Sequence, residues 1–79
     1  LRQMQAGSRP EEIQQAQARA AEAQANLRNA RLTLDRAEGL ARDGVFSREA
    51  LDNARAQFDM ARSNADAAEK NYELVTWDI

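Results

Sequence analysis

Residues 13–41 read IQQAQARAAEAQANLRNARLTLDRAEGLA. Their apolar side chains recur in alternating steps of three and four residues, at Ile13, Ala16, Ala20, Ala23, Leu27, Ala30, Leu34, Ala37 and Ala41. This is the a/d pattern of a coiled coil, in which one stripe of a helix packs against a partner helix. The pattern resumes after a break, at Leu51, Ala54, Phe58, Ala61, Ala65, Ala68, Tyr72 and Val75. The chain is therefore predicted to be all-α, with two long helices that each have one apolar face.

The start of the first helix is marked by polar residues and a proline. Ser8 precedes Glu11 by three residues, as in a capping box, and Pro10 stands in the first turn, where its missing N–H costs nothing. We expect Ser8 to cap a first helix over residues 9–43.

The break between the two stripes has the residues of a tight turn. Asp43-Gly44 ends a helix well, because glycine readily takes the left-handed conformation after a C-cap, and Ser47 can cap the next helix. We expect a turn over 44–47 and a second helix over 48–75. So short a connection forces the helices to run antiparallel, which predicts a long two-helix coiled-coil hairpin, roughly 50 Å in length.

The preferred pairing of the two stripes sets large side chains against small ones along much of the rod. It matches Ile13 with Val75, Ala16 with Tyr72, Leu27 with Ala61, Ala30 with Phe58 and Leu34 with Ala54. A register shifted by one heptad is also acceptable. Alanine methyl groups bury little apolar surface at about 25 cal/mol per Å², so an isolated hairpin should be only marginally stable. Off-stripe alanines such as Ala18, Ala21, Ala25, Ala56 and Ala67 leave smooth flanks for neighbouring copies of the chain, although high helix propensity explains them equally well.

The two ends of the sequence differ from the alanine-rich middle. Residues 1–7 are expected to be the end of a preceding helix or a linker. Residues 76–79 follow Val75 with a β-branched and an aromatic residue, so we expect an exit segment there that can begin a strand of another domain. No run of 18 or more apolar residues and no signal-peptide pattern occurs, so direct membrane insertion by this segment is not expected. The chain starts with Leu1, and we interpret it as a segment of a larger protein.

The composition argues against an enzyme, a cofactor site and a nucleic-acid partner. The chain has no histidine and no cysteine, which removes the commonest general base and the usual zinc ligands. Asp35, Glu38 and Asp43 gather near the turn but match no calcium-loop spacing, so a solvated helix face is the better interpretation and no metal is expected. A formal net charge of -2 offers no basic surface for phosphate backbones.

The residues around the turn are the candidate site. Arg36 and Leu40 lie one helical turn apart and off the a/d stripe, followed by Val45, Phe46 and Ser47. An exposed leucine beside an arginine suggests a surface that contacts a partner. The purely structural alternative is that Leu40 shields the edge of the stripe, Phe46 closes the end of the hairpin, Ser47 is only a cap, and Arg36 is solvated.

The turn also resembles a known motif. The spacing Arg36-x3-Leu40-x6-Ser47, within the sequence RAEGLARDGVFSREALDNA, resembles the hairpin tip of HlyD-like periplasmic adaptor proteins, or membrane fusion proteins. Upstream, the sequence AGSRPEEI of residues 6–13 is similar to the helix restart in members whose hairpins carry an extra helical pair. The resemblance covers nearly the whole chain.

This resemblance implies a role and a set of partners. Such adaptors belong to tripartite efflux pumps and type I secretion systems, and they bridge an inner-membrane transporter to a TolC-like outer-membrane channel. The implied location is the periplasm, in a protein anchored to the inner membrane, with the transporter bound through domains absent from this segment. The implied docking residues are Arg36, Leu40 and Ser47. A generic coiled-coil spacer or dimerisation arm is the alternative function.

Overall fold

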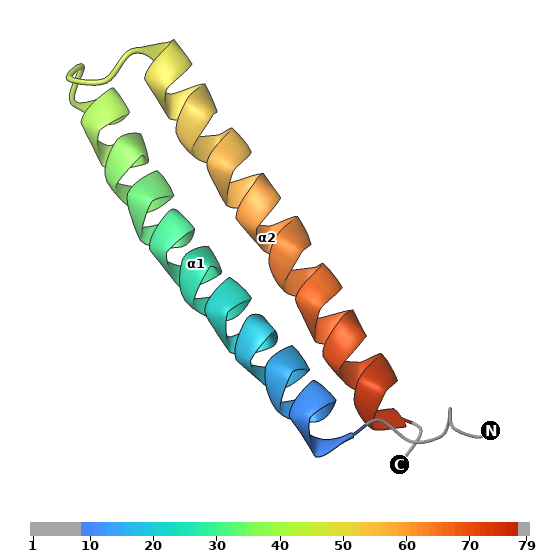
Figure 1. The fold of residues 1–79 in the computed structure, drawn as a ribbon. Coiled ribbons are helices and arrows are strands. Elements are labelled where there is room, and N and C mark those ends of the chain that lie inside the picture. The colour runs from blue at the N-terminus through green and yellow to red at the C-terminus, as the bar shows by residue number, and fades with distance from the viewer. Residues whose placement is uncertain (1–8, 78–79) are drawn as a thin grey trace.

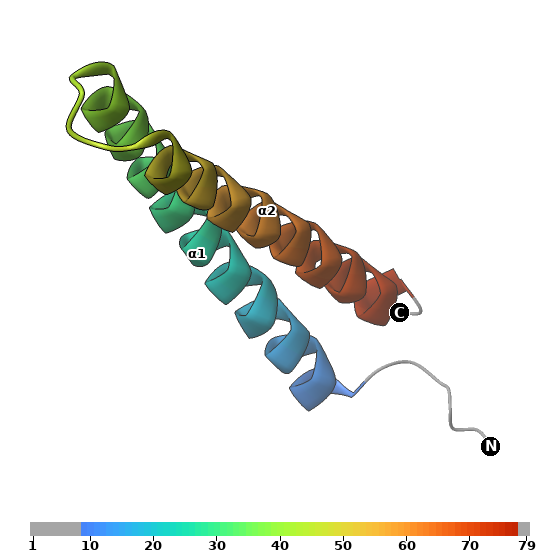
Figure 2. The same ribbon diagram turned by 90° about the horizontal axis from the view of Figure 1, so that it is seen from above.

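The computed structural model describes residues 9–77, which form two antiparallel helices joined by a short turn. Helix α1 spans Pro10–Arg42 and helix α2 spans Arg48–Trp77. They run antiparallel and side by side in Figure 1, and in the perpendicular view of Figure 2 they overlap near the turn and separate towards the other end of the rod. The molecule measures 61 × 15 × 13 Å. It is the predicted hairpin, a rod with the turn at one end and, at the other, the first turn of α1 and the last turn of α2.

The apolar stripes predicted from the sequence form the contact between the helices. Every one of their positions is buried or half-buried in the hairpin. The most buried side chains are all alanines, with exposed fractions of 8% or less: Ala16, Ala20, Ala37, Ala54 and Ala65. Because alanine has only a methyl group to bury, the rod is held by close backbone approach and by helix propensity more than by a large apolar core.

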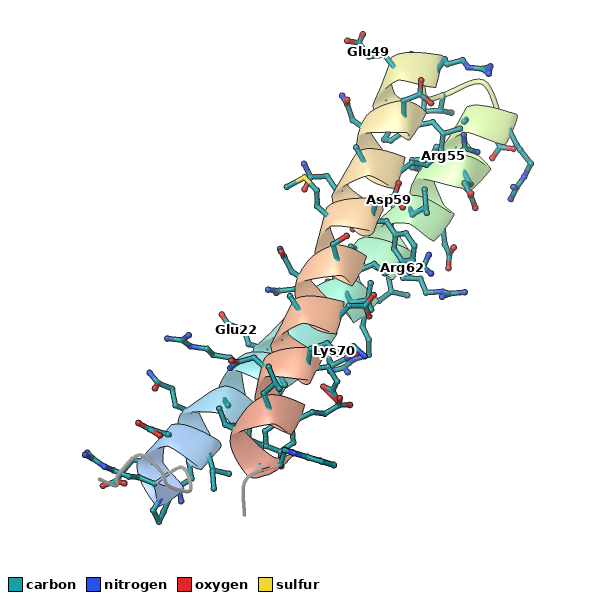
Figure 3. The ribbon with its side chains drawn as sticks, turned by 90° about the vertical axis from the view of Figure 1, so that its right-hand side faces the viewer. Glu22, Glu49, Arg55, Asp59, Arg62 and Lys70 are labelled. Atoms are coloured by element: carbon teal, nitrogen blue, oxygen red, sulfur yellow. The ribbon has the colours of Figure 1, made fainter. Side chains whose placement is uncertain are left out.

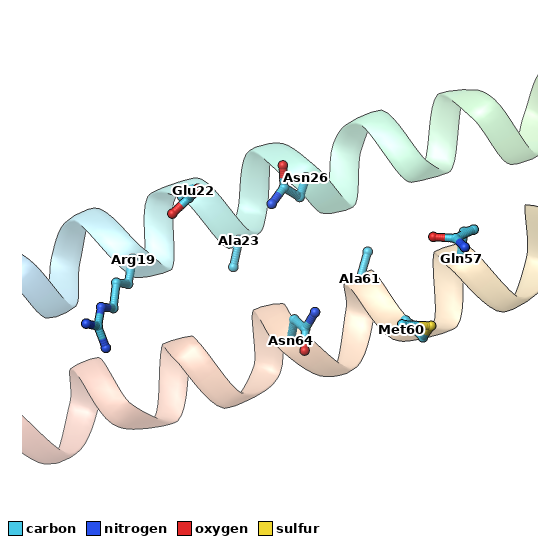
Figure 4. Close-up of a pocket in the computed structure, with 8 residues that line it drawn as sticks. All are labelled: Arg19, Glu22, Ala23, Asn26, Gln57, Met60, Ala61 and Asn64. Carbon is cyan, nitrogen blue, oxygen red and sulfur yellow. The ribbon is translucent and has the colours of Figure 1, made fainter.

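Shared grooves show which residues of the two helices lie at the same height. Ala16 borders one groove with Asn71 and Val75, and Ala20 borders another with Tyr72. Nearer the middle, Ala23 and Ala61 point into the space between the helices (Figure 4). A register shifted by one heptad would instead bring Ala16 to the height of Ala65. The grooves therefore place Ala16 near the height of Asn71 and Val75, close in sequence to its predicted partner Tyr72.

Helix α1 starts at Pro10, one residue later than expected, and its N-cap is likewise one residue later, at Arg9 in place of Ser8. Arg9 occupies the N-cap position with an extended backbone (φ -70°, ψ 154°), and Pro10 is the first helical residue. The side chain of Glu12 accepts a hydrogen bond from the Arg9 N–H at 3.4 Å. The expected Ser8 cap, with Glu11 as its partner, is therefore wrong, and Ser8 itself lies outside the described residues, as does the rest of the 1–7 segment. The physical reason is that a residue preceding proline is pushed out of the helical region, which makes Arg9 the boundary.

Helix α2 ends later than expected. It continues through Thr76 and Trp77, so the expectation that a strand begins there is wrong for these two residues. The Thr76 hydroxyl donates to the carbonyls of Tyr72 and Glu73, at 3.0 and 3.1 Å, which satisfies its polar group inside the last turn. A β-branched threonine is compatible with a helix when its hydroxyl is bonded in this way. The remaining part of the expected exit segment, residues 78–79, lies outside the described residues.

Candidate functional site

The hairpin tip is built around the carbonyl group of Leu40. The Val45 N–H donates to this oxygen at 2.8 Å and the Phe46 N–H at 3.1 Å, while the Gly44 N–H donates to the Ala41 carbonyl at 3.1 Å. Gly44 has a φ of 79°, the left-handed conformation that glycine adopts without strain. Together these bonds form a Schellman motif, which satisfies carbonyls that a helix end otherwise leaves unpaired. The turn is thus a defined structure.

Ser47 begins the second helix at the other side of the turn. Its Oγ accepts a hydrogen bond from the Ala50 N–H at 3.1 Å, and its carbonyl accepts from the Leu51 N–H at 3.1 Å. The expected cap at Ser47 is confirmed. A serine hydroxyl that accepts one bond keeps its hydrogen as a donor, and Ser47 is exposed. The residue can therefore cap α2 and donate to a partner at once.

The five predicted site residues lie at this end of the rod with different degrees of exposure. Val45 is 68% exposed and Phe46 is 38% exposed, at the outermost part of the turn. Arg36 is exposed on α1, one turn before Leu40. Leu40 is half-buried in the hairpin, so the expectation of an exposed leucine is wrong. The tip therefore presents an apolar surface beside a guanidinium group and a hydroxyl.

Four large apolar side chains outside the tip were not singled out by the sequence reasoning. They are Leu32 (62% exposed), Met60 (59%), Leu74 (67%) and Trp77 (82%). The signal was present, because Met60, Leu74 and Trp77 follow a second alternation of three and four residues on α2. The a/d pattern of α2 was the stronger signal, and the second alternation was therefore overlooked.

The rest of the described surface offers little for chemistry. Among residues 9–77, no three acidic side chains are grouped closely enough to hold a metal ion. The grooves between the helices are open and are lined largely by amide and charged side chains, as around Asn26, Gln57 and Asn64 (Figure 4). Within that range, neither helix is long and apolar enough to cross a membrane.

Comparison with protein families identifies one match. Residues 12–77 match the family described as "RND MFP, alpha-helical hairpin domain". The matched region includes almost all of both helices and the whole tip. No curated protein and no solved structure matches the chain.

Proposed function

The chain belongs to the α-helical hairpin domains of the RND membrane fusion proteins, and from this premise we propose that its tip docks onto a TolC-like outer-membrane channel. Membership supports the role of a membrane fusion adaptor in efflux. The finer proposal is that the hairpin, acting in the periplasm, bridges such a channel to an inner-membrane transporter, which other domains of the adaptor bind.

The observation that carries this proposal is the exposed apolar surface at the end of a long rod. Val45 and Phe46 lie in the turn at the extreme end of a 61 Å molecule, opposite the end where α1 begins and α2 ends. Backbone hydrogen bonds to Leu40 hold these two residues in place. A fixed apolar surface binds a partner at lower entropic cost than a mobile loop.

Each tip residue has a role that fits its chemistry. The Arg36 guanidinium has five N–H donors and would bind carboxylate or carbonyl oxygens of the channel. Val45 and Phe46, with the exposed part of Leu40, would enter an apolar groove of the channel. The Ser47 hydroxyl would donate one hydrogen bond.

The test uses the complete adaptor that contains this hairpin, with Arg36→Asp and Leu40→Asp combined. We expect capture of the channel protein and efflux to be lost, because the guanidinium is replaced by the opposite charge and the apolar contact by a carboxylate. Helix content, measured by far-UV circular dichroism of the 79-residue chain, should be retained.

The matched control is Arg19→Asp, which reverses the charge of another exposed α1 arginine far from the tip. It should leave channel capture intact. Full efflux and full capture by the double tip variant would contradict the docking proposal and leave the hairpin as a spacer.

A further inference from the structure

Arginine and leucine alternate every four residues along one side of α1, at Arg28, Leu32, Arg36 and Leu40. Residues four apart in a helix lie one above the other, so these side chains form a continuous line that runs from the middle of the rod to the tip. The tip residues Arg36 and Leu40 are thus preceded by a second arginine and leucine at the same spacing. We name Arg28 and Leu32 the shaft pair.

The shaft pair takes no part in the contact between the two helices. Leu32 lies two residues from both Ala30 and Leu34, which belong to the a/d stripe, so its side chain points to the opposite side of α1. It is 62% exposed, and Arg28 is exposed as well. Removing a leucine side chain from water contributes about 1.5–3 kcal/mol, and most of this free energy is not gained within the hairpin. Leu32 is therefore available to contact another molecule.

A glycine lies on the same side of α1, between the shaft pair and the turn. Gly39 follows Leu32 by seven residues, or two helical turns. Within a helix, glycine costs roughly 0.5–1 kcal/mol relative to alanine. A Cβ at Gly39 would meet only the Arg42 Nη2 atom at an ordinary 3.8 Å, so the packing of the hairpin does not require a residue without a side chain there. Its effect is on the outside, where it lets another chain approach the α1 backbone closely.

This side of α1 has an excess of positive charge. Asp35 lies one turn from Arg31, which offsets its charge, and Glu38 borders the groove towards α2 instead. The charges of Arg28 and Arg36 are left without such a neighbour of opposite sign. Helix α2 differs, because Figure 3 shows that positive and negative side chains follow one another along it, as at Arg55, Asp59 and Arg62. The outer side of α1 is therefore the one whose charge suits an acidic partner.

We propose that the outer side of α1 from Arg28 to Gly39 is a second docking surface for the channel, whose chain lies alongside α1 as well as meeting the tip. This inference rests on the proposed tip docking, since a partner held at Arg36 and Leu40 is the molecule nearest to the shaft pair. The surface fits an elongated segment with an apolar depression for Leu32 and a small residue against Gly39. The same segment has two carboxylates about 12 Å apart for Arg28 and Arg36, which lie eight residues apart on α1.

The first test changes the shaft pair and leaves the tip intact. Arg28→Asp and Leu32→Asp are combined in the complete adaptor, and its affinity for the purified channel is measured by surface plasmon resonance. We expect the affinity to fall about tenfold or more, because a charge is reversed and an apolar contact is replaced by a carboxylate. The matched control is Met60→Asp, which changes an apolar side chain of similar exposure (59%) on α2. It should bind the channel as the wild type does.

The second test separates binding from stability at Gly39. Glutamine is a good helix former, so Gly39→Gln should raise the thermal midpoint of the 79-residue hairpin. In the complete adaptor, the same substitution should weaken channel binding, because its side chain keeps the channel away from the α1 backbone. A glycine with no partner would give the gain in stability without the loss in affinity, and unchanged affinity of Gly39→Gln would therefore overturn the close contact at this residue.

The remaining outcomes distinguish this inference from the tip docking on which it rests. If the shaft variant binds as the wild type does while Arg36→Asp with Leu40→Asp loses capture, the second surface is refuted and tip docking stands. Wild-type affinity of both variants would contradict both. A weaker self-association of the Leu32→Asp adaptor in sedimentation without the channel would assign Leu32 to a neighbouring copy, and it would equally overturn the inference.

Discussion

Along the shaft the most buried side chains between the two helices are alanines, whereas from Leu40 to Ser47 the chain is held by backbone hydrogen bonds. The shaft has five buried side chains, all alanine, and depends on close approach of the helices. At the tip, residues 42–49 are all exposed, yet specific backbone hydrogen bonds fix the conformation of the turn. The difference shows that the shaft and the tip have different structural roles. Packing in the shaft sets the length and direction, and the bonded turn sets the shape of the surface at the end.

The largest expected effect comes from placing a charge in the shaft contact. Ala65 is 1% exposed, so Ala65→Asp buries a carboxylate without a partner, at a cost of about 3 kcal/mol or more. The hairpin is weakly packed, and we expect it to lose most of its helix content in far-UV circular dichroism. The control is Ala67→Asp, the same substitution two residues later on the exposed face, measured in dilute solution. A folded Ala65→Asp hairpin would mean that the alanine contact is not what holds the helices together.

A smaller effect is expected from the backbone of the turn. Gly44→Ala places a Cβ at a φ of 79° with no atom within 4 Å, so the loss of about 1–2 kcal/mol comes from backbone strain alone. Thermal unfolding should show a lower midpoint for this variant.

Gly39 is the matched glycine for that experiment. It lies within α1, and a Cβ there meets only the Arg42 Nη2 atom at an ordinary 3.8 Å. Gly39→Ala should raise stability by about 0.5–1 kcal/mol, because alanine loses less entropy in a helix than glycine. Changes in stability of opposite sign would show that the turn requires glycine at position 44, whereas α1 only tolerates glycine at position 39. If both substitutions changed the stability in the same direction, the left-handed conformation of Gly44 would not explain the structure of the tip.

Much of this structure could be predicted from the sequence because it depends on regular spacing. The inner stripes, Gly44 and Ser47 all obey local rules, and the structure places each of them as those rules require. The N-cap could not be placed from the Ser8–Glu11 spacing, since the conformational limit that Pro10 imposes on Arg9 outweighs the preference for serine. The end of α2 was missed because the β-branched Thr76 suggested a strand, whereas its hydroxyl bonds to the carbonyls of the preceding turn.

The same spacing rules could predict only part of the candidate site. Spacing located Arg36, Leu40 and Ser47 near the turn, but exposure depends on how the chain folds back at Gly44. Leu40 is half-buried, and its carbonyl accepts the hydrogen bonds that fix the turn. The exposed apolar side chains Met60, Leu74 and Trp77 of α2 show the reverse problem. Their spacing was readable, but only the hairpin shows that they are exposed.

A pair of substitutions separates the two roles of Ser47. Ser47→Ala removes the Oγ that accepts from the Ala50 N–H, at a cost of about 1 kcal/mol, and it also removes the hydroxyl donor. Ser47→Asp keeps an acceptor at the N-cap and adds a negative charge at the positive end of α2, so stability should stay near that of the wild type. It still lacks the hydroxyl hydrogen. If Ser47 donates a bond to the channel, both variants lose channel capture by the complete adaptor, although only Ser47→Ala is less stable. Full capture by Ser47→Asp would instead reduce Ser47 to a helix cap, and the specificity of the tip would then rest on Arg36 and the apolar residues of the turn.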